Sequence, residues 1–137
     1  MATTANTAVL PQTPISRAAV CTAAETAFHA PTNVVDLLTA ADNANGARIT
    51  RLYAIARAAI GTANNVQLYE RNGATYTLVD SALLGVHTPG ASVPNGKIDF
   101  GYTDDNPLYV RAGYGLAVAI GLAVANGGVV KAEGGLY

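Results

Sequence analysis

The stretch that decides the fold is residues 115–124, which read Gly-Leu-Ala-Val-Ala-Ile-Gly-Leu-Ala-Val. Large apolar residues occupy every second position, and alanine or glycine fills the positions between them; the large residues are Leu116, Val118, Ile120, Leu122 and Val124. A strand places such residues on one face, whereas a helix would scatter them around its circumference. Because the residues on the other face are small and apolar rather than polar, we predict a strand that is covered on both faces.

A turn follows at residues 126–128, which read Asn-Gly-Gly, and residues 129–133 have the pattern of a returning strand. We therefore predict a central β-hairpin over 115–133. With the three turn residues as its loop, one apolar face stays continuous, and the facing pairs are Val124 with Val130 and Leu122 with Ala132.

A membrane-spanning helix is the alternative for this region. Residues 112–130 contain no charged residue and have about the length that a transmembrane helix needs. Five glycines, an asparagine and the strict alternation argue against a helix. We expect a strand here and no membrane partner.

Composition points to a single domain whose surface is partly covered by other chains. The chain has 137 residues, of which 50% are hydrophobic and 12% are charged, against a typical charged share of about 25%. So small a share of charged residues predicts a homo-oligomer. The alternative is a monomer rich in alanine, glycine and threonine. The net charge of −1 gives no electrostatic footprint for a nucleic acid.

Cysteine content and the N-terminus bear on where the chain is made. Cys21 stands alone, so neither an intrachain disulfide nor a cysteine metal cluster is expected. The first basic residue is Arg17, and no apolar core of a signal peptide follows the start methionine. We expect synthesis in a cytoplasm without export by the secretory route.

The N-terminal residues 1–16 are predicted to form an extended arm, and residues 17–137 a single β-sandwich domain. The arm is rich in Ala, Thr, Asn and Pro, so it is either disordered or laid on a neighbouring subunit. Its apolar residues, which we expect to make that contact, are Val9, Leu10 and Ile15.

Short strands with turn signals between them fill the rest of the chain. Besides the hairpin, the expected strands are 17–23, 33–39, 47–58, 64–70, 74–83, 97–102 and 108–111. A short helix after Thr32 is the alternative within the second of these. About eight short strands at this spacing, with no long amphipathic helix, predict an all-β antiparallel sandwich or barrel.

The strand at 47–58 carries the candidate interface. Ile49 and Leu52 can share a face only if a β-bulge lies between them. With the bulge, the inward residues are Ile49, Leu52, Ala54 and Ala56, and the outward residues are Arg51, Tyr53, Ile55 and Arg57. The outward set is too apolar for a plain solvated face, and a mixture of Arg and Tyr is typical of an interface.

The clearest hairpin lies around the Asn-Gly pair at 72–73. A two-residue turn there would mix polar and apolar residues on one face. A three-residue loop at 71–73, with Gly73 in the left-handed region, keeps the core face apolar. We therefore predict that Leu68 pairs with Tyr76 and that Val66 pairs with Leu78.

No catalytic, cofactor or metal motif is visible, so we expect neither an enzyme nor a bound cofactor. His29 and His87 lie outside any metal-ligand spacing, and a nucleophilic pair of Cys21 with His29 would need a third, orienting group. A calcium site is the alternative for the acidic loop, whose oxygen-bearing residues are Asp99, Asp104, Asp105 and Asn106. Ordinary turn chemistry explains that loop equally well.

Several segments together resemble a group of small jelly-roll virion proteins of tailed bacteriophages, which decorate or cement capsids. The segments are Gly46–Tyr53, Gln67–Tyr69, Tyr76–Leu78, Pro107–Val110 with Gly113, and Val130–Tyr137. The likeness covers roughly residues 33–137, and Leu136 departs from the Gly-Gly-Asp-Tyr ending of the group. The resemblance implies a jelly roll without catalysis, a homotrimer, and the major capsid protein or another virion protein as partner.

The leading hypothesis is therefore a capsid decoration protein on the virion surface that bridges major capsid subunits. The alternative is a tail- or fibre-associated module that recognises a host glycan or protein through exposed loop aromatics. The candidates for that role are Tyr102, Tyr109 and Tyr114. A small hydrolase is a third hypothesis.

Overall fold

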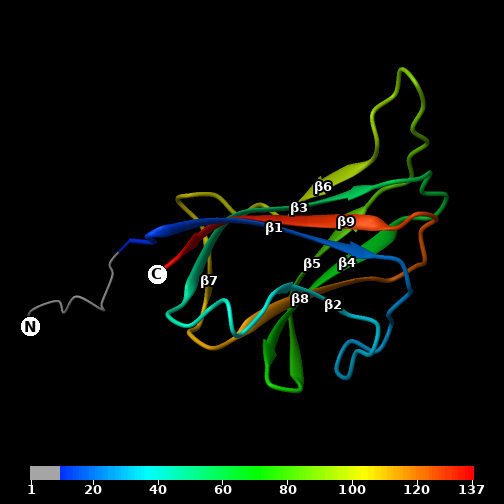
Figure 1. Cartoon of the computed structure of the whole chain (residues 1–137). Helices are drawn as coiled ribbons and strands as arrows, with labels where there is room; N and C mark the ends of the chain where they lie inside the picture. Colours follow the sequence, from blue (N-terminus) through cyan, green and yellow to red (C-terminus); the bar gives the residue numbers. More distant parts are fainter. Residues whose placement is uncertain (1–9) are drawn as a thin grey trace, which may run out of the picture.

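The computed structural model describes residues 10–137 and consists there of nine β-strands without a helix (Figure 1). The strands are β1 (Thr13–Cys21), β2 (Val35–Leu38), β3 (Ala47–Ala56), β4 (Asn64–Asn72), β5 (Thr75–Leu84), β6 (Lys97–Asp99), β7 (Leu108–Val110), β8 (Gly115–Ile120) and β9 (Gly128–Leu136). The all-β prediction is confirmed, and the strand count is nine rather than eight.

The strands form two antiparallel sheets that face each other as a sandwich. The first sheet has the order β1-β9-β3-β6, with β7 also paired to β3, and the second has the order β2-β8-β4-β5. Only β4 and β5 are both consecutive in the chain and paired with each other. Every other pairing joins strands that are distant in sequence.

The predicted hairpin over 115–133 is wrong, because β8 and β9 belong to opposite sheets. β8 ends at Ile120, and the Asn64 side chain then holds the Leu122 backbone with two hydrogen bonds of 2.8 and 3.0 Å. This contact turns the chain out of the second sheet. Leu122 is 44% exposed, Val124 is buried outside any strand, and Val130 pairs with Ala19 and Ala54 instead.

The membrane-helix alternative also fails. Residues 112–130 contain β8 and the start of β9, and no helix in the described part of the chain is long and apolar enough to cross a membrane.

The predicted bulge in β3 is confirmed. The register of β3 against β9 shifts between Ile49 and Arg51, which lets Ile49 and Leu52 both point inward with no exposed surface. Gly134 on β9 lies against this bulge, and a Cβ there would come within 2.0 Å of the Arg48 carbonyl oxygen. Only glycine lets the two backbones approach so closely.

The β4–β5 hairpin has a different register from the predicted one. Its turn is the two-residue Gly73-Ala74, since Asn72 pairs with Thr75, and Gly73 is left-handed as expected with a φ of +60°. The predicted pairs of Leu68 with Tyr76 and of Val66 with Leu78 are wrong. A bulge at Val79, which the sequence argument did not include, shifts the ladder so that Leu68 pairs with Asp80.

Two boundaries near the N-terminus also change. β1 begins at Thr13 rather than at residue 17, so residues 13–16 pair with β9 of the same chain instead of belonging to an arm. The region expected as a strand or a short helix after Thr32 contains the strand β2. In the rest of the predicted arm, the Gln12 N–H donates to the Leu136 carbonyl at 2.8 Å, and residues 1–9 lie outside the described residues.

The outer face of the second sheet is covered by the loop at 22–34. The Glu25 N–H donates to the Ile120 carbonyl at 2.7 Å, and the Gln67 side chain donates to the Glu25 carbonyl at 2.9 Å. Under this loop Ala117 and Ala119 are fully buried. The prediction that the strand at 115–120 is covered on both faces is confirmed.

Glu25 closes this loop on itself. Its carboxylate is buried and accepts backbone hydrogen bonds from Asn33, Thr32 and Ala27 at 2.6, 2.8 and 2.9 Å. These donors, the Asn33 N–H foremost, hold the pKa of Glu25 below its ordinary value against the opposing effect of burial. The charged carboxylate is thus a structural part of the cover over the second sheet.

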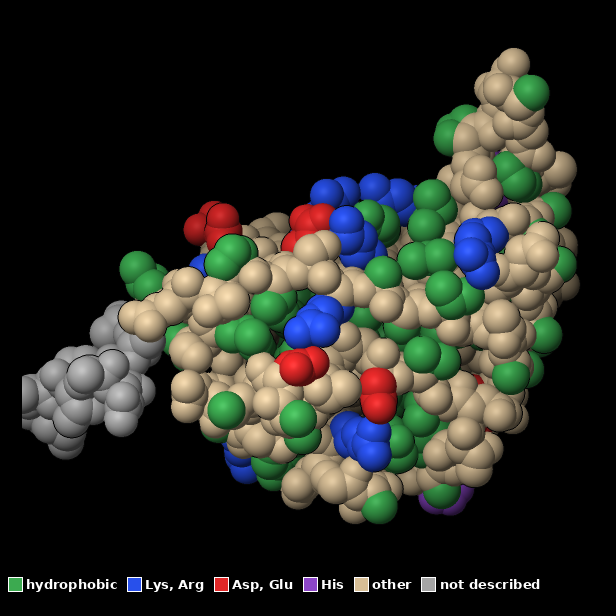
Figure 2. Space-filling model, viewed as in Figure 1, with side chains coloured by type: hydrophobic (Ala, Val, Ile, Leu, Met, Phe, Trp, Pro, Cys, Tyr) green, Lys and Arg blue, Asp and Glu red, His purple; other side chains and the backbone are tan. Residues whose placement is uncertain are grey.

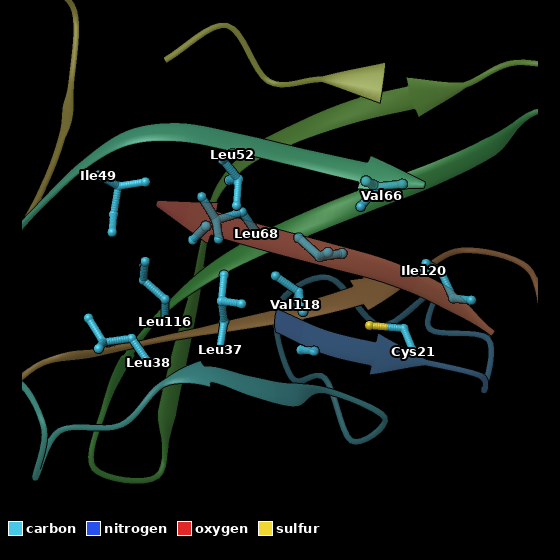
Figure 3. Close-up of a cluster of buried hydrophobic side chains, with 14 of the residues drawn as sticks. Cys21, Leu37, Leu38, Ile49, Leu52, Val66, Leu68, Leu116, Val118 and Ile120 are labelled. Carbon is cyan, nitrogen blue, oxygen red and sulfur yellow. The ribbon is translucent and has the colours of Figure 1, made fainter. Parts of the chain in front are cut away.

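The core lies between the two sheets and is almost entirely aliphatic (Figure 3). Figure 3 shows side chains from β1, β2, β3, β4 and β8 meeting in one cluster, with Leu52 from the first sheet and Leu68, Leu116 and Val118 from the second. Cys21 packs in the same cluster as a small apolar group.

Replacing Ile120 by Ala is expected to lower the free energy of unfolding by about 2–5 kcal/mol, because the side chain is buried and leaves a cavity. The matched control is Leu122→Ala, which the alternating pattern treats as equivalent but which is expected to cost at most about 1 kcal/mol. Urea denaturation measures both. Equal losses for the two variants would contradict the position at which β8 ends.

Replacing Glu25 by Gln is expected to lower the free energy of unfolding by about 1–3 kcal/mol at pH 7, because charge-assisted hydrogen bonds are weakened in a buried site. The folded-state pKa is lowered, so the carboxylate stabilises the fold above its unfolded pKa of about 4.3, and that stabilisation is lost as the pH falls through the folded value.

The difference between wild type and this variant should therefore shrink below about pH 4 in urea denaturation. Asp105→Asn, at an exposed carboxylate, is the control and should change stability little at either pH. A difference for Glu25→Gln that grows towards low pH would refute the role of the charge.

Candidate interaction surface

The outer face of the first sheet carries the sequence-predicted residues and is the candidate functional surface. We call it the basic face. Its members are Ala18 and Val20 on β1, Val129, Lys131 and Glu133 on β9, Arg51, Tyr53 and Ile55 on β3, Arg57 just after β3, and Lys97 and Asp99 on β6.

The register arranges these side chains in rows across the strands. One row places Tyr53 between Lys131 and Asp99. The next row is apolar: Val20 lies opposite Val129, which lies opposite Ile55. Val20 is 39% exposed, so this apolar row is accessible from outside the sandwich.

Tyr53 is held at the centre of the face by two cations. The Arg51 guanidinium carbon lies 4.7 Å from the centroid of the ring, and the Lys97 Nζ lies 4.4 Å from it. Both distances fit cation–π attraction, which draws the two charges over the aromatic ring. The side chains therefore form one continuous patch.

The basic face has an excess of positive charge. It holds four cations and two carboxylates, and Glu133 lies 3.5 Å from Lys131 and 3.9 Å from Arg51. Within residues 10–137, Arg57 and Lys97 have no carboxylate within 4.0 Å, and the Arg57 Nε donates instead to the Asn126 carbonyl at 2.6 Å. Figure 2 shows blue side chains along the upper side of the molecule, over the strands of the first sheet, with apolar groups between them.

Three carboxylates outside the set named above are paired with arginines. The pairs join Asp36 to Arg71, Asp42 to Arg17, and Asp104 to Arg48, at 2.8, 3.2 and 3.5 Å, and the last of them lies at the edge of the outer face of the first sheet, where Arg48 is opposite Gly135. Three cations have no carboxylate within 4.0 Å in residues 10–137; Arg57 and Lys97 lie on the basic face and Arg111 lies elsewhere, while the whole chain carries a net charge of −1.

The structure brings together four of the seven predicted interface residues, namely Arg51, Tyr53, Ile55 and Arg57. Ile15 instead lies in β1 and packs against the core of its own chain, while Leu10 precedes β1 and is 71% exposed. Val9 lies outside the described residues. The sequence does not reveal that Lys97, Lys131, Val20 and Val129 belong to this face, because only the pairing of β9 with β1 and β3, and of β6 with β3, places them beside Tyr53 and Ile55.

The residues that could have carried chemistry are dispersed. His29 is exposed in the loop at 22–34, and the His87 ring contacts the Pro94 carbonyl in a loop at 85–96 that projects from one end of the sandwich (Figure 1). No hydrogen bond joins Cys21 to His29 in the described part of the chain. Asp104 contacts Arg48, and residues 10–137 contain no group of three His, Cys, Asp or Glu that could hold a metal ion.

Comparisons with known protein families, with curated proteins and with solved structures found no match for this chain.

Cys21 is expected to be unreactive in the folded protein. Burial raises the pKa of its thiol to about 11, so at pH 8 only about one molecule in a thousand carries the thiolate that attacks a disulfide reagent. Dithionitrobenzoate should label Cys21 slowly in buffer and rapidly in denaturing urea. Labelling of the native protein at the rate of a free cysteine would contradict its place in the core.

Proposed function

We propose that the chain is a structural protein of a tailed-bacteriophage virion, which binds the outside of the capsid through the basic face and bridges neighbouring major capsid subunits. The basic face is the observation that carries the proposal. An accessible apolar row rimmed by cations is suited to an interface with an acidic partner. The low charged share of the chain, 12%, agrees with a protein that works in contact with other chains.

We further infer that the sandwich is a jelly roll. The strand orders β1-β9-β3-β6 and β2-β8-β4-β5 support this inference, with β7 as an addition that pairs with β3. Jelly rolls consist of two four-stranded sheets built from Greek keys and are common in viral capsid proteins. This topology agrees with the family resemblance in residues 33–137.

The charge of the basic face disfavours its pairing with the same face of a sister subunit and favours a partner of opposite charge. In a twofold-symmetric dimer the same patch meets itself, so the excess cations would lie close together and repel. We infer that the partner surface is rich in carboxylates. The homotrimer that the resemblance implies would then assemble through other surfaces.

Shell stabilisation would follow from mass action. A protein that binds only the assembled lattice stabilises that lattice relative to free subunits. Because many copies bind one shell, each contact can be modest while the total effect is large. No catalytic step is required.

The double variant Arg57→Glu and Lys97→Glu is expected to bind capsids at least about tenfold more weakly than wild type, because two cations that have no carboxylate partner within residues 10–137 become anions at an acidic interface. Co-sedimentation with purified shells measures the binding. Arg111→Glu is the control, since it reverses one charge outside the basic face, half the change of the double variant, and should bind normally. Equal binding by all three proteins would overturn the proposed face.

Copy number separates the leading proposal from the alternative of a tail- or fibre-associated module. Quantitative mass spectrometry of virions should count hundreds of copies per particle for a capsid decoration protein. A dozen copies or fewer would contradict it in favour of the tail.

A further inference from the structure

A second surface feature is independent of the basic face. It is an open groove of about 420 Å³ at one end of the sandwich, and it shares no residue with the basic face. Its chemically distinctive lining residues are Asn45, Gly46, Glu70, Tyr109, Arg111 and Tyr137. The volume lies within the range of small-molecule sites.

The two tyrosines differ in how firmly they are held. The Tyr137 N–H donates to the Gly46 carbonyl at 3.0 Å, and its ring lies across Gly46, where a Cβ would come within 3.6 Å of it. Gly46 also has a φ of +101°, which favours glycine. Tyr109 lies on β7, opposite Arg48 of β3, and is 63% exposed.

Tyr109 is the one member of the three loop aromatics whose hydroxyl is uncommitted within residues 10–137. The Tyr102 hydroxyl donates to Asp80 at 2.6 Å, and the Tyr114 hydroxyl accepts from Asn72 and Arg111 at 3.3 Å each. Tyr109 makes no side-chain hydrogen bond within residues 10–137, lies on the outer side of β7 opposite Arg48, and lines the groove.

Two opposite charges lie in the groove without neutralising each other. Glu70 pairs with the buried Leu116 in the register of β4 and β8, so it points between the sheets at their open end. Neither Glu70 nor Arg111 has an ion-pair partner within 4.0 Å in the described chain, and the Arg111 guanidinium instead stacks 5.1 Å from the Tyr114 ring centroid. The charges of Glu70 and Arg111 sum to zero, which disfavours a ligand with a net charge.

We propose that this groove binds a neutral saccharide. An aromatic ring offers its face to the apolar C–H side of a sugar, and Tyr109 is the exposed ring in the groove. Glu70 can accept hydrogen bonds from sugar hydroxyls, while Arg111 and the Asn45 amide can donate them. This combination of an apolar platform with a few polar groups is the general composition of a small-ligand site.

The affinity for one sugar ring is expected to be low. A monosaccharide has about a dozen non-hydrogen atoms, and the usual binding free energy per atom places its dissociation constant in the millimolar range. Many copies on one particle would convert such weak binding into firm attachment to a glycan-coated surface.

Nuclear magnetic resonance of the full chain tests the proposal. The protein is titrated separately with glucose, galactose, N-acetylglucosamine and maltose, each up to about 50 mM. That concentration is roughly tenfold above a dissociation constant in the low millimolar range. At least one sugar is expected to shift the amide signals of Gly46, Tyr109, Arg111 and Tyr137. Tyr109→Ala is expected to weaken that binding at least about tenfold, because it removes the stacking platform.

Tyr53→Ala is the matched control, since it removes a tyrosine from the basic face and should leave sugar binding unchanged. Folding of both variants is checked from their unaltered core signals. Absence of shifts in the groove for every sugar, or shifts that survive Tyr109→Ala in the folded variant, would overturn the site. Neither result bears on the capsid proposal, whose test is shell binding by the charge-reversed variant.

Discussion

The rest of the structure depends on the insertion of β9, the last strand, between β1 and β3. β9 pairs with β1 from Gly128 to Leu136 and with β3 over the same span, so the first sheet is not continuous without it. The close approach at the bulge of β3 requires Gly134, because any larger residue would collide with the Arg48 backbone. Since β1 and β9 lie at opposite ends of the described chain, folding requires contacts of very long sequence separation, which predicts slow folding for a domain of this size.

The same insertion creates the candidate interaction surface. The outer residues of β9, Lys131 and Val129, fill the space between the outward side chains of β1 and β3. Without β9, Tyr53 and Ile55 would have neighbours only from β6. With β9, they form part of a continuous sheet face in which an apolar row is flanked by cations, and a flat face of that kind can meet a broad protein partner.

The faces of individual strands could be predicted from the sequence, but the pairing of strands could not. Alternation at 115–120 and the bulge between Ile49 and Leu52 depend on local geometry, and both are confirmed. Alternation does not specify which strand lies alongside. For that reason the predicted hairpin over 115–133 is wrong, and the sequence gives no sign that Lys97 and Lys131 lie beside Tyr53 and Ile55. The bulge at Val79 places the charged Asp80 inward, where it accepts from Tyr102, and an apolar pattern gives no signal for such a polar pair.

The central claim is that the basic face contacts acidic groups of the capsid, and zero-length cross-linking tests it directly. Lys97 and Lys131, which are the only two lysines of the chain, both lie on this face. A carbodiimide joins a lysine amine to a carboxylate only when the two are in direct contact. On decorated particles, mass spectrometry should find Lys97 or Lys131 joined to aspartate or glutamate of the major capsid protein. The opposite result would contradict the account: cross-links only between carboxylates of this chain and capsid lysines, with Lys97 and Lys131 both unmodified.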